Sequence, residues 1–141
     1  MKKFINQEVA NFTLLYTKLH NYHWFVTGKG FFQLHAKFEE LYDYVTEKLD
    51  EIAERLLQVD GKPVATLKEV LDLATLKEAT GEENVDGMIQ SVLNDFTQLN
   101  EEFTRGIKLA EEENDPVTVD LFTGIKADLE KHIWMLRAYL K

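Results

Sequence analysis

The sequence predicts an all-α fold, namely a four-helix bundle with one long crossover connection that contains a short helix. The chain has 141 residues, of which only two are prolines and seven are glycines. Apolar residues make up 45% of the chain and recur at helical spacing, and no long segment alternates between apolar and polar residues. A chain of this length can bury a sizeable core, so we expect a single domain spanning residues 1–141.

The first two helices are predicted on either side of a short turn that contains glycine. The first runs over about residues 3–26, and the TGKG segment at 27–30 ends it because glycine tolerates the backbone angles of a tight connection. The second runs over about residues 32–59 and stops at Asp60-Gly61. The expected core positions are Val9, Phe12, Leu15, Tyr16 and Leu19 in the first helix, and Leu34, Phe38, Leu41, Val45, Leu49, Ile52 and Leu56 in the second.

A long connection separates the second helix from two further helices. It is long enough to cross a bundle, although an up-down-up-down bundle with a decorated loop remains an alternative. Thr66-x-x-Glu69 and Thr75-x-x-Glu78 both match the capping-box pattern, and we expect the first to begin a short helix. A third long helix is predicted over about residues 84–113. Asp115-Pro116 then begins the last helix, with an acid as N-cap and proline in the first turn.

Composition excludes several classes of function. The chain has no cysteine, which excludes disulfides and thiolate metal sites. Its 25 acidic and 16 basic residues give a net charge of −9, and such a surface repels nucleic acid unless basic residues are segregated. No apolar stretch approaches the ~18–20 residues of a membrane span, and no secretory signal pattern is present. We therefore expect a cytoplasmic protein.

Four potential metal ligands lie on one face of the second predicted helix. His35, Glu39, Asp50 and Glu54 fall at about 0°, 40°, 60° and 100° around the helix axis. The apolar seam is centred about 130° away, so this stripe faces either water or another subunit. His35 and Asp50 are about 22 Å apart along the axis, whereas metal–ligand distances are about 2 Å. One helix therefore cannot complete a metal site from this stripe.

A second, antiparallel copy of the same helix can complete such a site. Residues 35 and 54 have the same midpoint as residues 39 and 50. A twofold axis at this midpoint brings the His35/Glu39 end of one chain to the Asp50/Glu54 end of the other, twice over. The sequence thus predicts two metal sites at a twofold interface.

The types of ligand restrict the metal. Histidine nitrogen and carboxylate oxygen without sulfur suit iron, manganese or zinc, and a ligand set with open positions suits Fe(II) that meets an oxidant. The Glu-x-x-His motif of di-iron centres inside a bundle is absent. A solvated acidic face remains the alternative, because residues 35–60 contain eight acids, Asp60 included. Other nearby residues also have ordinary structural interpretations: hydrogen bonding at a helix end for His23, and packing or structural roles for His20, Trp24 and Phe25.

The segment HNYHWFVTGKGFFQLHAKFEELY, followed by KLDEIAERLL, resembles the signature of the Dps mini-ferritins, and EKHIWMLRAYL resembles their C-terminal helix. The resemblance covers essentially the whole chain. It implies a ferritin-like four-helix subunit with a short helix in the crossover. Twelve such subunits form a hollow shell whose ferroxidase centres lie at twofold interfaces. The resemblance also implies oxidation of Fe(II), preferentially by hydrogen peroxide, storage of Fe(III) and protection against oxidative damage.

The resemblance assigns His23 and His35 to one subunit and Asp50 and Glu54 to its twofold mate. Glu39 occupies a position that is commonly Asp in this family, and the extra methylene affects its distance to the metal and the filling of a second iron position. The resemblance also matches Trp24 to a tryptophan that acts as an electron donor beside the site. It matches Asp115 and Asp120 to acids near threefold pores that admit Fe(II).

Two further expectations concern partners. Family members that bind DNA commonly use a lysine-rich terminal tail, so with a net charge of −9 we expect no strong DNA binding. The alternatives to a ferroxidase are a non-catalytic helical assembly and an interface with a structural or buffering zinc or manganese site. No glycine-rich phosphate loop or nucleophile elbow points to other chemistry.

Overall fold

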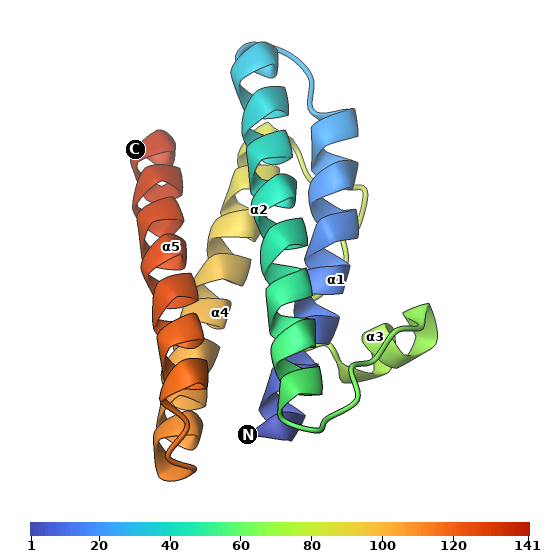
Figure 1. Cartoon of the computed structure of the whole chain (residues 1–141). Helices are drawn as coiled ribbons and strands as arrows, with labels where there is room; N and C mark the ends of the chain where they lie inside the picture. Colours follow the sequence, from blue (N-terminus) through green and yellow to red (C-terminus); the bar gives the residue numbers. More distant parts are fainter. The chain divides into compact units, whose positions relative to one another are not determined.

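The computed structural model describes all 141 residues, and the chain is entirely helical, as predicted (Figure 1). It divides into two compact units. Residues 2–85 form one unit, and residues 86–141 together with Met1 form the other. None of the helices is long and apolar enough to span a membrane.

The unit of residues 2–85 is built on two long helices, α1 (Lys2–Phe25) and α2 (Phe31–Gln58), which pack along each other. Gly28 and Gly30 in the intervening turn have φ angles of 88° and 83°, a region that side chains with a Cβ rarely adopt. The predicted boundaries of both helices are correct to within one residue. Six of the seven predicted core positions of α2 are buried, and Leu49 is half-buried.

The prediction for Tyr16 was wrong. Its side chain is 41% exposed and contacts the rings of His20 and Tyr42 instead of the core. Tyr16 fits the apolar spacing of α1, but its phenol remains partly in water, as is common for an amphipathic side chain. Trp24 and Phe25, for which packing roles were considered, are also largely exposed.

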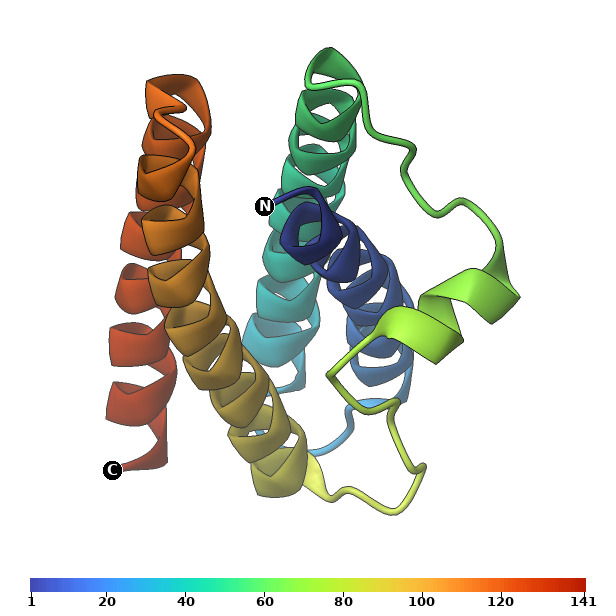
Figure 2. The same ribbon diagram turned by 90° about the horizontal axis from the view of Figure 1, so that it is seen from below.

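The long connection after α2 leaves that helix sharply and contains α3 (Leu67–Leu73), which packs on α1 (Figure 2). A Cβ at Gly61 would lie 2.2 Å from Leu56 Cδ1, so any larger residue there would force the buried Leu56 side chain to shift. Thr66 caps α3 as predicted: its hydroxyl accepts from Glu69 N–H and donates to the Glu69 carboxylate at 2.7 Å. No helix begins at Thr75. Its main-chain N–H instead donates a hydrogen bond to the side chain of Asn11, a buried residue of α1.

The other unit consists mainly of α4 (Val85–Glu112) and α5 (Pro116–Leu140), which lie side by side in both views (Figures 1 and 2). Phe103 and Phe122 pack edge to face across this pair, and Lys126 donates to Asn100 at 3.1 Å. The predicted start of α5 is confirmed, because Asp115 accepts a 3.0 Å hydrogen bond from Thr118 N–H.

Candidate metal site

The short turn between α1 and α2 brings two histidines together. His23 Nδ1 lies 2.7 Å from the main-chain oxygen of His35, and His35 Nδ1 lies 2.7 Å from the main-chain oxygen of His23. A carbonyl oxygen only accepts hydrogen bonds, so both Nδ1 atoms carry the proton. In the neutral form of either ring, the lone pair is therefore on Nε2. This is the tautomer in which metal-binding histidines are commonly held.

The two imidazole rings are also fixed by stacking. Their centroids are 3.7 Å apart with an angle of 14° between the ring planes. Phe31 stacks on His35 as well, at 5.0 Å and 20°. His23 is only 7% exposed and His35 is half-buried. Little side-chain freedom remains to be lost when an ion binds.

Glu39 lies one helical turn after His35, and its carboxylate is exposed. Tyr42 donates a 3.3 Å hydrogen bond to Glu39 Oε1, and the Tyr42 ring meets the His23 ring edge-on at 5.3 Å. Burial and the negative charge of Glu39 raise the pKa of Tyr42 above its usual range, so the phenol holds its proton. Tyr42 thus contacts one of the two histidines and the carboxylate.

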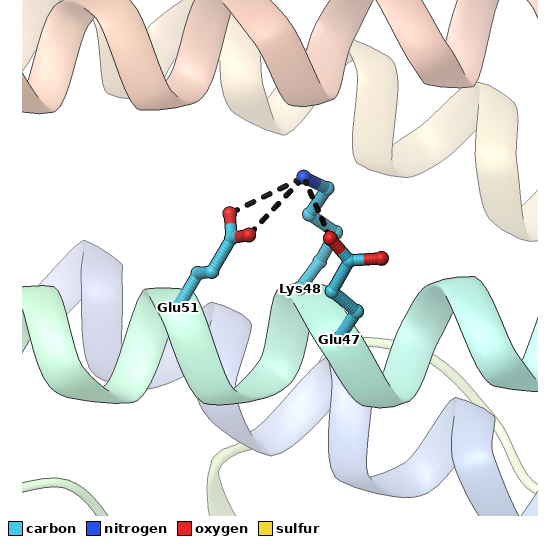
Figure 3. Close-up of polar contacts among 3 residues, drawn as sticks. All are labelled: Glu47, Lys48 and Glu51. Atoms are coloured by element: carbon cyan, nitrogen blue, oxygen red, sulfur yellow. Dashed lines mark hydrogen bonds and ion pairs between the residues drawn. The ribbon is translucent and has the colours of Figure 1, made fainter.

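Asp50 and Glu54 lie on α2, far along the helix from the histidines. Both are exposed, and neither is hydrogen-bonded or ion-paired within the chain. Their neighbours Glu47 and Glu51 differ, because Lys48 Nζ lies 4.0 Å from Glu47 and 3.2 Å from Glu51 (Figure 3). Asp50 and Glu54 thus form no ion pair with a cation of their own chain.

No group of three or more metal-binding side chains converges within one chain. The fold brings His23 and His35 together but leaves Asp50 and Glu54 apart from them. This is the arrangement that the twofold hypothesis requires, and it leaves the solvated acidic face open as the alternative.

A shallow groove borders Asp50 within the unit of residues 2–85. It is lined by the α2 residues Leu49 and Ala53, by segment 63–65 of the long connection, and by the α1 residues Val9 and Thr13. Asp50 therefore lies at the edge of a partly apolar, concave surface.

Trp24, the predicted electron donor, is 66% exposed and does not contact the two stacked histidine rings directly. Its ring lies 5.3 Å from His20, which in turn stacks on Tyr42 at 3.8 Å. Sequence reasoning missed Tyr42. The signal was its spacing, seven residues after His35 and three after Glu39, which places all three side chains on neighbouring positions of one helix face.

The two predicted pore residues lie at the start of α5. Asp115 acts as the N-cap, with one carboxylate oxygen bound by Thr118 N–H at 3.0 Å and the other by the Thr118 hydroxyl at 2.5 Å. Asp120 is exposed and one turn further along. Both carboxylate oxygens of Asp115 are thus used in capping α5 within the same chain.

Comparisons with known proteins give a consistent result. A family model described as a ferritin-like domain matches residues 2–141. General stress protein 20U of Bacillus subtilis is 53% identical over 136 residues, which cover 96% of this chain and 94% of that protein. DNA protection during starvation protein 2 of Bacillus anthracis is 47% identical and covers 96% of this chain, with 93% of that protein matched.

A crystal structure of a Dps protein from Bacillus brevis superposes with a TM-score of 0.98 at 47% identity, covering 99% of this chain and 94% of that one. The fold class predicted from the sequence, a ferritin-like helical bundle, is therefore confirmed.

Proposed function

The chain belongs to the ferritin-like family as a Dps mini-ferritin, and on this premise we propose that it is a ferroxidase that stores iron. It oxidises Fe(II), with hydrogen peroxide as the preferred oxidant, and holds the Fe(III) product inside a hollow homo-dodecamer. Each subunit is one domain, and the protein acts in the cytoplasm against oxidative damage. Fe(II) is the substrate and the stored iron is the cargo.

The proposed ferroxidase centre is shared by two subunits related by a twofold axis. His23, His35 and Glu39 come from one subunit, and Asp50 and Glu54 come from its mate. The observation that carries this proposal is the reciprocal pair of Nδ1 hydrogen bonds between His23 and His35, which leaves both Nε2 atoms as ligands. The unpaired charges of Asp50 and Glu54 support it, since carboxylates buried at an interface need a cation.

The chemistry follows from the ligands. Imidazole nitrogen and carboxylate oxygen both bind Fe(II), and the carboxylates also stabilise the Fe(III) product. Two Fe(II) ions give two electrons to one hydrogen peroxide, which is reduced to water without release of hydroxyl radical. Glu39 is one methylene longer than aspartate, so its reach governs how well a second iron ion is held.

Anaerobic oxidation of Fe(II) by hydrogen peroxide tests this proposal, with the near-ultraviolet absorbance of the Fe(III) product as the readout. We expect fast oxidation and a soluble iron product with the wild type, and slow oxidation with the Asp50→Ala/Glu54→Ala variant. Glu47→Ala/Glu51→Ala is the matched control, because it removes two acids of the same helix that pair with Lys48. Equal rates in all three proteins, near the protein-free background, contradict the ferroxidase proposal.

A zinc or manganese site at the same interface is a second candidate function. Neutral histidine and carboxylate ligands suit these ions as well as Fe(II), and the pre-set His23 and His35 tautomers serve a structural ion equally well. Competition between Zn²⁺ and Fe(II) for the interface distinguishes a structural or buffering site from a ferroxidase site. If Zn²⁺ binds tightly and excess Fe(II) neither displaces it nor is oxidised, the interface is a structural or buffering site.

We also propose that protection of DNA is chemical and needs no contact with DNA. The net charge of −9 opposes binding to a polyanion, and neutralisation of phosphates by Lys and Arg dominates such binding. A gel-shift experiment at low salt checks this. Tight, salt-sensitive retardation of DNA contradicts the proposal.

A further inference from the structure

A cluster of aromatic rings lies beside the two stacked histidines, on α1 and α2 of the same unit. Tyr42 is at its centre, stacked on His20 at a centroid distance of 3.8 Å and an angle of 19°. The Tyr42 ring also meets His23 edge-on at 5.3 Å and Tyr16 at 6.5 Å. On the far side, His20 contacts Trp24 at 5.3 Å. Aromatic contacts therefore run without a break from the proposed iron ligands to an exposed tryptophan.

Tyr42 is the member of this cluster that contacts both kinds of proposed ligand in its own subunit. Its ring touches His23, and its hydroxyl donates to Glu39 Oε1 at 3.3 Å. Phenol and indole are among the side chains that lose one electron most readily, and a phenol must release its proton as it does so. A carboxylate within hydrogen-bond reach accepts such a proton. Tyr42 has both the position and the proton acceptor that an electron donor needs.

An electron from a protein side chain is needed when only one Fe(II) is bound. One Fe(II) gives hydrogen peroxide a single electron, and the products of that reaction are hydroxide and hydroxyl radical. Complete reduction to water requires a second electron. The resemblance relates the position of Glu39 to the second iron, and Glu39 is the longer acid there, so the site that holds one Fe(II) is the state in which such an electron matters.

Resting on the proposed ferroxidase function, we propose that Tyr42 supplies this second electron to hydrogen peroxide at a site that holds one Fe(II). In the balanced step, Fe(II), the Tyr42 phenol, hydrogen peroxide and one proton give Fe(III), the neutral Tyr42 phenoxyl radical and two water molecules. The O–O bond of peroxide breaks, the phenol O–H bond breaks, and the phenol proton leaves along its hydrogen bond to Glu39 and ends in water. Iron and tyrosine are each oxidised by one electron.

The contacts around Tyr42 also give the radical a route outward. His20 is held by a 2.7 Å contact from its Nδ1 to the main-chain oxygen of Tyr16, and it lies between Tyr42 and Trp24. Trp24 is 66% exposed within its own chain, a position that suits reduction by a small molecule. Trp24 therefore acts after Tyr42, two further ring contacts away from the iron ligands.

Freeze-quench electron paramagnetic resonance tests the proposal on the assembled protein. Protein with one Fe(II) per site, and separately with two, is mixed anaerobically with one equivalent of hydrogen peroxide per site. We expect a tyrosyl radical signal from the wild type with one Fe(II), and loss of that signal in Tyr42→Phe, which keeps the ring. In Trp24→Phe we expect the tyrosyl signal to persist longer.

Tyr44→Phe is the matched control, because Tyr44 is on the same helix but about 200° around its axis from Tyr42. It should retain the signal. Circular dichroism and size-exclusion chromatography establish that each variant folds and assembles. A signal that survives in Tyr42→Phe, or a wild type that oxidises iron with no tyrosyl signal, overturns the role of Tyr42. A wild type that oxidises no Fe(II) at either loading overturns the ferroxidase proposal itself.

Discussion

The Tyr22 hydroxyl donates a 2.5 Å hydrogen bond to the Glu83 carboxylate, so the end of α1 holds the last residues of the long connection before α4 begins. The Thr80 main-chain N–H donates to the same carboxylate at 2.9 Å, and so does the Thr80 hydroxyl. Burial on its own raises the pKa of Glu83, but these hydrogen bonds outweigh it and lower the pKa to about 2.

Stability should therefore depend on pH through Glu83. A pKa lowered in the folded state stabilises the fold fully above the usual value of 4.5, and this contribution is lost as the pH falls towards 2. We expect Glu83→Gln to be less stable than the wild type at pH 6, with the difference shrinking between pH 4.5 and 2. Urea unfolding followed by circular dichroism across this range measures the effect. A constant difference at every pH assigns the loss to packing instead.

Asn11 is predicted to hold the middle of the long connection against α1. Its side chain is fully buried, and its Oδ1 accepts from the main-chain N–H groups of Thr75 and Leu76 at 2.8 and 3.1 Å. Asn11→Ala should cost about 2 kcal/mol in the free energy of unfolding, because a buried polar group without a partner costs about 1–3 kcal/mol.

Asn6→Ala is the comparison for Asn11. Asn6 also joins α1 to the long connection: its Oδ1 accepts from Val64 N–H and its Nδ2 donates to Lys62 O. Asn6 lies nearer the surface, where water can replace it. Its loss should cost less than about 1 kcal/mol. Denaturant unfolding of the two variants decides the point, and equal losses would mean that burial of Asn11 contributes little.

Mixed assembly tests whether the iron site is shared between subunits. A His23→Ala/His35→Ala chain and an Asp50→Ala/Glu54→Ala chain should each be inactive alone. Dissociated and reassembled together in equal amounts, they should recover about one quarter of the wild-type sites, because half of the twofold pairs are mixed and each mixed pair regains one of its two sites. Recovery of peroxide-dependent Fe(II) oxidation is the readout. No recovery in correctly assembled particles argues for a site within one chain.

Variants of Asp115 and Asp120 should distinguish a role in helix capping from a role in an iron pore. Asp115→Ala removes the N-cap of α5 and should cost about 1 kcal/mol of stability, whereas Asp120→Ala should cost little. If both acids line a pore that admits Fe(II), Asp120→Asn should slow iron uptake at low Fe(II) without changing stability. Thermal unfolding and stopped-flow absorbance measure the two effects. Unchanged uptake in Asp120→Asn removes this residue from the pore proposal.

Local sequence signals determined the secondary structure of this protein. The caps at Thr66 and Asp115 and the turn glycines at 28 and 30 lie within a few residues of the structures they terminate or begin. Each acts through a bond or a backbone angle of its own segment, so spacing alone was sufficient to place them. The stripe of candidate ligands on α2 could also be predicted, because the helical period determines which residues share a face.

Tertiary structure decided the contacts between segments. The pairing of His23 with His35, the stacking of His20 on Tyr42 and the bonds from Asn11 to the long connection join residues 12 to 65 positions apart. Such contacts depend on how α1, α2 and α3 pack, and the residue types involved occur in many other arrangements. The sequence by itself therefore identified the candidate ligands and their face. Only packing set the tautomers of the two histidines and brought Tyr42 next to them, because both depend on atoms supplied by another helix.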